Sequence, residues 1–286
     1  MPTRVGCSGD DEHALRDDRG YNKAVTESLE PLMLRRDEGG IATLTLNRPE
    51  QRNGLFRALI GALDEALQRI AGEAETRVVV LAAAGPAFSA GHDLKELRAA
   101  NDVTSHRAVF AACGALMQRI LALPQPVIAQ VQGVATAAGC QLVATCDLAI
   151  AAQSARFATP GVDIGLFCST PMVALARVVP RKAALEMLYT GAMIDAAEAH
   201  RLGLVNRVVA DGDLASAVHA LARRIAGKSA AVVALGKRAF HRQIEMPTAE
   251  AYAAMAEVMA ENLLLADAHE GIDAFLAKRA PRFQDR

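Results

Sequence analysis

Hydrophobic residues follow two patterns in the first half of the chain. Short apolar runs at 41–46 and 78–81, rich in valine, isoleucine and leucine, are typical of buried β-strands. The stretch 55–70 instead places leucine or isoleucine at every third or fourth position, which is the spacing of one helix face. Strands and helices therefore alternate, and this favours an α/β fold built from right-handed strand–helix units.

The same patterns extend over the rest of the sequence. They predict further strands at 32–36, 126–131, 147–151 and 204–209. They predict helices at 93–99, 106–122 and 137–145, followed by a largely helical region at 171–178, 183–189, 196–200, 213–226, 230–243, 249–267 and 270–278. We expect the folded structure to begin near residue 31 and residues 1–30 to form a flexible N-terminal extension.

Charge and residue spacing limit the partners that the chain can have. It has 286 residues and a net charge of −1, so it offers no basic surface for nucleic acid or for an anionic membrane. No uninterrupted apolar run is long enough to cross a bilayer. The histidines have no metal-ligand spacing, and we expect no bound metal.

The cysteines and the acidic start of the chain suggest a compartment. The five cysteines are odd in number and form no CxxC pair, so we expect reduced and mostly buried thiols. Residues 1–30 contain Asp10, Asp11 and Glu12 but no apolar run, which argues against a secretory signal and against a mitochondrial transit peptide. Together these features predict a cytoplasmic protein.

Two glycine- and alanine-rich stretches carry the strongest chemical signal. Residues 88–94 read FSAGHDL and residues 133–141 read GVATAAGCQ. Each follows an apolar run and places small residues where a helix begins, so that backbone N–H groups and a helix dipole can approach a ligand. Two such helix starts facing one point would form an oxyanion hole for a carbonyl that gains negative charge.

With these stretches in place, the chain resembles the crotonase superfamily, that is, the enoyl-CoA hydratase/isomerase family. The resemblance runs from Leu32 to the C-terminus and also rests on the motifs at 46–49, 126–140, 146–147, 190–191, 203–205 and 275–279. The stretches 91–97, 135–142 and 165–171 resemble the branch of enoyl-CoA hydratase domain-containing protein 3. The family relationship implies a ClpP-like spiral of ββα units, here at 31–210, and a helical trimerisation region at 211–286.

The resemblance also implies a substrate and an assembly. Family members act on acyl-CoA thioesters as lyases or isomerases, for example in fatty acid metabolism, and usually form homotrimers or dimers of trimers. Coenzyme A is part of the substrate, so no separate cofactor is expected. The resemblance assigns the two oxyanion-hole N–H groups to His92 and Ala138. It assigns CoA contacts to Ala90 and Lys95 at the entrance and, often from a neighbouring subunit, to Phe275 and Lys278 at the nucleotide end.

The chain departs from the family at both catalytic glutamates. One position is Gln141, whose amide does not titrate usefully, and the other is Gly161, which has no side chain. General acid–base catalysis contributes about 10²–10⁴-fold per group, so we expect hydratase activity to be weak or lost. Isomerisation, hydrolysis or decarboxylation of an acyl-CoA are alternatives, and so is a non-catalytic acyl-CoA-binding protein.

Other residues near these positions leave several hypotheses open. Asp93 is expected to cap the following helix, and Asp163 to be solvated or to cap a turn. The His92 ring either points into the pocket or packs against the protein. Cys168 either precedes a helix that starts at a proline or acts as a thiol nucleophile. The missing side chain at Gly161 could leave a hole for a water or a small anion.

Overall fold

The computed structural model describes residues 31–285. The chain divides into two compact units, Met1–Glu30 and Pro31–Arg286, so the extension expected at 1–30 lies outside the described residues. Among the residues that are described, no helix is both long and apolar enough to cross a membrane.

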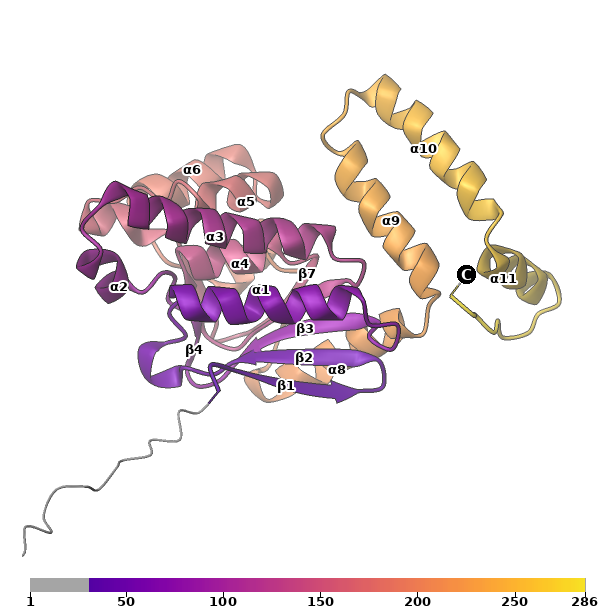
Figure 1. Ribbon diagram of the computed structural model, residues 1–286, viewed down its shortest axis with the longest axis horizontal. Coiled ribbons are helices and arrows are strands. Elements are labelled where there is room, and N and C mark those ends of the chain that lie inside the picture. The colour runs from indigo at the N-terminus through magenta and orange to yellow at the C-terminus, as the bar shows by residue number, and fades with distance from the viewer. Residues whose placement is uncertain (1–30, 286) are drawn as a thin grey trace, which may run out of the picture. The chain divides into compact units, whose positions relative to one another are not determined.

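From the first strand to the fifth helix, strands come in pairs that are followed by helical segments (Figure 1). The four repeats are β1 (Met33–Glu38), β2 (Ile41–Leu46) and α1 (Arg57–Ala71); β3 (Val78–Ala83), β4 (Ala87–Ser89), α2 (Leu94–Ala99) and α3 (Val103–Ala122); β5 (Val127–Val131), β6 (Val134–Thr136) and α4 (Ala138–Thr145); and β7 (Leu148–Ala152), β8 (Arg156–Ala158), the 3₁₀ helix η2 (Pro160–Ile164) and α5 (Pro171–Val178). This order is the expected succession of ββα units.

The strands form two sheets. The larger has the order β1-β2-β3-β5-β7-β10, with β10 at Arg207–Val209, and all its neighbours are parallel except the β1–β2 hairpin. The smaller has the order β4-β6-β8-β9, with β9 at Ile194–Asp195. From the second repeat onward, the first strand of each pair joins the large sheet and the second joins the small one. The α/β prediction is confirmed, but the strands of the small sheet were not predicted.

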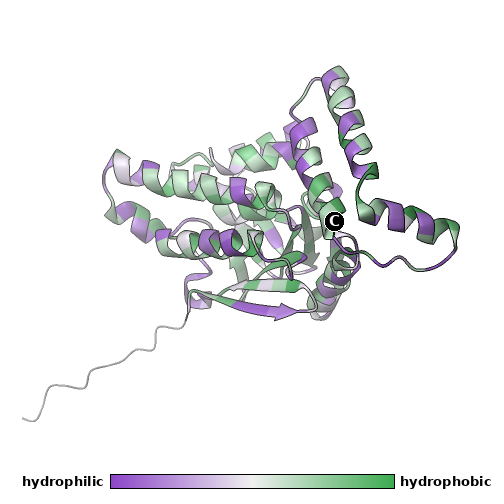
Figure 2. Cartoon of the chain, turned by 45° about the vertical axis from the view of Figure 1, so that its right-hand side comes forward, coloured by the Kyte–Doolittle hydropathy of each residue, from purple (hydrophilic) through white to green (hydrophobic). Residues whose placement is uncertain are grey.

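Helices cover both faces of the large sheet. On one face, Leu59, Leu63 and Leu67 of α1 are fully buried against it, as their spacing predicts. On the other face, α8 (Leu214–Ala226) buries Leu214 and Val218 against alternate residues of the same strands (Figure 1). β1, the edge strand, is mostly hydrophilic and exposed (Figure 2).

The chain ends in a helical arm. The remaining helices are α6 (Arg181–Thr190), α7 (Ala196–Arg201), α9 (Ala230–Gln243), α10 (Thr248–Leu263) and α11 (Ala266–Leu276). The two helices predicted at 249–267 and 270–278 are both present, but the break between them comes earlier, because the chain leaves the helical conformation after Leu263 and re-enters it at Ala266. Hydrophilic and hydrophobic residues alternate along α9, α10 and α11 (Figure 2).

One lysine anchors this arm to the body. The Nζ of Lys237, on α9, donates to the carbonyl oxygens of Ile120 and Gln125 at 2.8 and 3.1 Å, and to Oδ2 of Asp147 at 2.6 Å. The lysine side chain is only 7% exposed. His241, one turn further along α9, reaches the other oxygen of Asp147 at 3.3 Å. A buried ion pair therefore joins α9 to the segments that precede β5 and β7.

Candidate active site

The carboxyl ends of β4, β6 and β8 lie side by side, because these strands are parallel neighbours in the small sheet. β4 leads to Gly91 and His92, and β6 leads to Ala137 and Ala138. The hydroxyl of Thr136, the last residue of β6, donates to the carbonyl of Ala90 at 3.1 Å. The two stretches that the sequence singled out therefore meet at one edge of the sheet.

Two glycines allow this close approach. Gly91 has φ +89°, and a Cβ there would lie 2.9 Å from the carbonyl oxygen of Thr136 and 3.1 Å from the nitrogen of Ala138. A Cβ on Gly139 would lie 2.2 Å from the carbonyl oxygen of Ser89, closer than two non-bonded atoms can approach. A side chain at either position would separate the two loop-to-helix junctions.

The N–H groups of His92 and Ala138 are both available at this point. Within residues 31–285, neither of them donates a hydrogen bond to a protein acceptor. Ala137, immediately before α4, has φ +49° and ψ −118°, a conformation that L-residues rarely adopt. Its own N–H donates to the carbonyl of Ala158 at 2.9 Å, and this bond fixes the start of α4 against the end of β8.

The His92 ring packs against the protein. Its Nδ1 lies 3.2 Å from the carbonyl oxygen of Leu55, and its edge meets the Phe110 ring at a centroid distance of 5.2 Å. Because a carbonyl only accepts hydrogen bonds, Nδ1 carries the proton and Nε2 is the unprotonated nitrogen. Burial lowers the pKa of His92, so the ring is neutral near pH 7. Of the two hypotheses for this ring, the packing one fits the observed contacts.

Three residues lie next to the first junction in the chain, Ala90 before it and Asp93 and Lys95 after it. The carboxylate of Asp93 accepts from the N–H groups of Lys95 and Glu96 at 2.9 and 3.2 Å, which confirms its predicted role as the N-cap of α2. Ala90 and Lys95 are exposed, so both are accessible to a ligand that approaches from solvent.

The two other strand ends contribute neutral polar side chains. Gln141 lies one turn into α4, is 5% exposed, and its Oε1 has no hydrogen-bond partner among the described residues. Thr159 follows β8 directly and is fully buried, and its hydroxyl likewise has no partner there. Leaving a buried polar atom unpaired costs about 1–3 kcal/mol, so two such atoms at one sheet edge indicate a place for a polar ligand.

Gly161 leaves no hole. A Cβ there would lie 2.9 Å from the carbonyl oxygen of Leu166 and 3.0 Å from Sγ of Cys168. The hypothesis of a water or small anion in the place of the missing side chain is therefore wrong, because the segment that follows η2 fills that space. Asp163 is exposed, as predicted, and its Oδ2 would lie 2.9 Å from a Cβ on Gly191.

The structure places the two predicted C-terminal residues on the arm. Phe275, on α11, is 81% exposed, and Lys278 follows that helix with φ +52°. Neither lies on the elements that carry the junctions. Their contact with the nucleotide end of CoA, proposed to come from a neighbouring subunit, stays a prediction.

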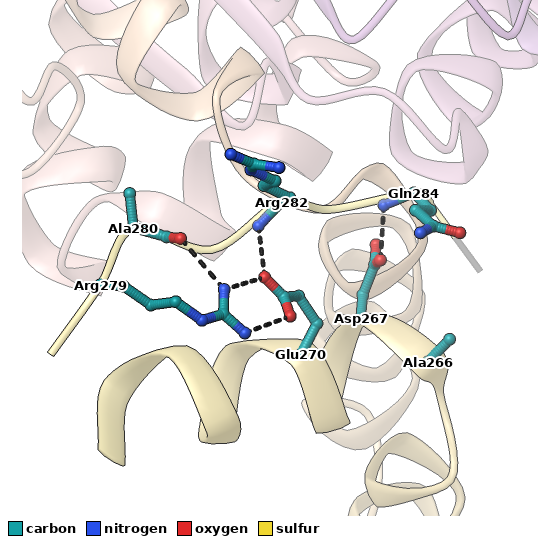
Figure 3. Close-up of a pocket in the computed structure, with 7 residues that line it drawn as sticks. All are labelled: Ala266, Asp267, Glu270, Arg279, Ala280, Arg282 and Gln284. Atoms are coloured by element: carbon teal, nitrogen blue, oxygen red, sulfur yellow. Dashed lines mark hydrogen bonds and ion pairs between the residues drawn. The ribbon is translucent and has the colours of Figure 1, made fainter. Parts of the chain in front are cut away.

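A pocket of about 730 Å³ lies between α11 and the last residues of the chain (Figure 3). Its polar groups already bind one another: Glu270 accepts from the Arg279 guanidinium at 2.6 and 2.7 Å, and Asp267 accepts from the N–H of Gln284 at 2.6 Å. The Arg279 guanidinium lowers the pKa of Glu270 to about 2. These contacts fasten the tail to α11, and none of the predicted site residues lines the pocket.

The four described cysteines match the prediction of reduced and mostly buried thiols. Cys113, Cys140, Cys146 and Cys168 are all free and buried. Within residues 31–285 no group of three histidine, cysteine, aspartate or glutamate side chains could hold a metal ion.

Comparisons with known proteins identify the family of this chain and several relatives. A family profile described as enoyl-CoA hydratase/isomerase matches residues 36–286. Enoyl-CoA hydratase domain-containing protein 3 of Xenopus laevis is 49% identical over 251 residues, which cover 88% of this chain and 85% of that protein. The crystal structure of an enoyl-CoA hydratase from Mycobacterium smegmatis is 53% identical, covers 89% of this chain and 99% of its own, and superposes with a TM-score of 0.87. The human domain-containing protein 3 structure is 46% identical, covers 88% of this chain and 100% of its own, and gives the same TM-score.

The same comparisons correct the predicted compartment. The matching domain-containing proteins of frog, rat, mouse, human and zebrafish are all named mitochondrial. The prediction of a cytoplasmic protein is therefore wrong. It rested on the acidity of residues 1–30, which lie outside the described part of the chain.

Proposed function

Because the chain belongs to the enoyl-CoA hydratase/isomerase family and has the crotonase fold, we propose that it binds an acyl-CoA thioester and stabilises its enolate. The backbone N–H groups of His92 and Ala138 donate to the thioester oxygen. Ala90 and Lys95 line the entrance for CoA, and Phe275 and Lys278 meet its nucleotide end from a neighbouring subunit of a homotrimer or a dimer of trimers.

One observation carries this proposal. Two backbone donors that have no protein acceptor within residues 31–285 lie on abutting loop-to-helix junctions, at the carboxyl ends of neighbouring parallel strands. Donors held in this way need no reorganisation when negative charge develops on an oxygen, and removing one typically lowers a rate about 10²–10³-fold. The donors belong to the backbone, so the arrangement tolerates histidine and alanine side chains at these positions.

The side chains around the donors are compatible with acyl-CoA binding but lack the groups that hydration needs. Hydration of an enoyl thioester requires a group that takes a proton from water, and Gln141 and Gly161 cannot do so. We therefore expect this protein to form an enolate without adding water efficiently. Isomerisation, hydrolysis and decarboxylation of an acyl-CoA remain compatible with such a site.

Two variants test the donors. Gly91→Ala places a methyl group 3.1 Å from the Ala138 nitrogen at φ +89°, so it should obstruct the hole and weaken acyl-CoA binding about tenfold or more. His92→Ala keeps the backbone N–H and should bind within about threefold of the wild type, since its ring is not a donor to the substrate. Calorimetry with butyryl-CoA measures both.

Turnover is then measured on a panel of acyl-CoA thioesters by mass spectrometry. We expect crotonyl-CoA hydration to be weak or absent in the wild type. Efficient hydration that disappears in Gln141→Ala would contradict our account of the missing carboxylates. Binding without any product would favour a non-catalytic acyl-CoA-binding protein, and no binding at all would refute the proposed function.

A further inference from the structure

The segment after η2 brings a titratable side chain to Gly161. Sγ of Cys168 lies 3.0 Å from the position that a Cβ on Gly161 would occupy. Backbone hydrogen bonds hold the segment in place: Leu166 N–H donates to the Gly161 carbonyl at 2.9 Å, and Met172 N–H donates to the Cys168 carbonyl at 2.9 Å. A thiol therefore takes the space into which a side chain from position 161 would extend.

The thiol lies at the same sheet edge as the oxyanion donors. Gly161 is the third residue after β8, and the carbonyl of Ala158, the last residue of β8, accepts from the N–H of Ala137. Cys140, next to Gln141 on α4, lies near Cys168: burial chiefly raises the pKa of Cys140 to about 12, and the Cys168 thiol raises it further. The thiol thus lies near the segments that follow β6 and β8.

Independent polar groups mark this place as a ligand site. Gln141 is only 5% exposed and Thr159 is fully buried. Within residues 31–285, Oε1 of Gln141 and Oγ1 of Thr159 nevertheless have no hydrogen-bond partner. Thr159 directly precedes η2, which contains Gly161, and Gln141 directly follows Cys140 on α4. A polar substrate group at this edge would complete their hydrogen bonds.

The other titratable side chains in the neighbourhood have their own contacts. Asp93 caps α2, and His92 donates from Nδ1 to the Leu55 carbonyl, while its buried Nε2 has no partner within residues 31–285. Asp163 is exposed and its carboxylate lies beside Gly191. Cys140 is fully buried on α4. Cys168 is 7% exposed, so it can exchange its proton with solvent while remaining inside the site.

We propose that Cys168 is the proton-transferring residue of this site, in the place of the carboxylate that Gly161 lacks. The proposal rests on the proposed function, because it needs an enolate held by the N–H groups of His92 and Ala138. In one direction the thiolate takes a proton from the α-carbon: the C–H bond breaks, its electron pair forms the enolate, and an S–H bond forms. In the other direction the S–H bond breaks, its proton returns to the α-carbon, and the electron pair stays on sulfur.

The surroundings suit both directions. Burial raises the pKa of the Cys168 thiol, so the sulfur holds a proton near pH 7. A backbone hydrogen bond from Gly161 offsets part of this rise by stabilising the thiolate, which is the form that removes a proton. Water is not added to the substrate in either step, so the residue supports enolate formation without hydratase activity.

Deuterium exchange at the α-carbon measures this step alone. Butyryl-CoA is incubated with the protein in D₂O, and mass spectrometry follows deuterium incorporation while calorimetry measures binding. We expect exchange in the wild type and a loss of about 100-fold in Cys168→Ala and in Cys168→Ser, whose hydroxyl is a far weaker acid, with binding unchanged in both. The matched control Cys113→Ala removes another buried thiol, on α3, and should exchange at the wild-type rate.

The outcomes distinguish this inference from the proposed function. Exchange by Cys168→Ala at the wild-type rate overturns the inference and leaves the proposed function intact. Binding of butyryl-CoA without exchange in the wild type also overturns it. Parallel loss of binding and exchange in both Cys168 variants assigns the thiol a structural role instead. If the wild type does not bind butyryl-CoA, the proposed function fails, and the inference fails with it.

Discussion

The side chain of His92 links a predicted donor position to the stability of the fold. Its ring is held between the Leu55 carbonyl and the Phe110 ring, and burial lowers its pKa. The unfolded chain therefore binds more protons than the folded one as the pH falls below the ordinary histidine value of 6.5. Stability should be complete above that pH and should decrease as the pH drops through 6.5 toward the lower folded value.

Denaturant unfolding of the wild type and of His92→Gln at about pH 7.5 and about pH 5.5 measures this effect, since the amide does not titrate. The loss of stability between the two values should be smaller in the variant. Equal losses in the two proteins would show that other groups cause the pH dependence.

Individual residues differ in how far the sequence alone predicts them. The cap at Asp93 was predictable because it depends on residues two and three positions away. The contact of His92 with Leu55 joins residues 37 positions apart, and the filling of the Gly161 position depends on how the following segment turns back. These features follow from tertiary packing, which local patterns do not contain.

At the scale of elements, the sequence predicted the large sheet but not the small one. The small sheet consists of strands of two or three residues, such as β4 and β9, which are too short to show alternation or a sustained apolar run. Yet β4, β6 and β8 carry the junctions of the candidate site at their ends. The glycine- and alanine-rich stretches signalled the chemistry, while the supporting strands became visible only in the structure.

Two helical glycines should respond in opposite ways to the same substitution. Gly139→Ala, on α4, forces a methyl group against the Ser89 carbonyl and should destabilise the protein by about 3 kcal/mol while separating the two junctions. Gly114→Ala, on α3, meets nothing within 4 Å and should stabilise it by about 0.5–1 kcal/mol. Denaturant unfolding measures both, and wild-type stability in Gly139→Ala would contradict the observed contact.

At the scale of the whole molecule, the arm presents large apolar side chains to solvent. Tyr252 on α10 is 77% exposed, and Phe275 and Leu276 on α11 are 81% and 73% exposed. Several large exposed apolar side chains on one arm are typical of a subunit interface. We expect light scattering to give a mass about three or six times the 30.2 kDa of the chain.

Replacing both Phe275 and Leu276 by serine should shift that mass toward the monomer, because the assembly loses its exposed apolar contacts. Lys228→Met, at an exposed position before α9, is the control and should leave the mass unchanged. A wild-type protein that is monomeric at micromolar concentration would contradict the predicted trimer.

The ion pair of Lys237 makes the stability of the body depend on α9, which belongs to the part of the chain that is synthesised last. Asp147 lies 90 positions earlier, and its side chain is 15% exposed, so until α9 arrives it is a carboxylate without its buried counter-charge. A protein truncated after residue 229 would keep every strand and still lack that cation. Breaking a buried pair typically costs about 3–5 kcal/mol, so we expect Lys237→Met to be far less stable than Lys228→Met in unfolding experiments. The nascent polypeptide can then reach its native state only after release of its C-terminal helices from the ribosome.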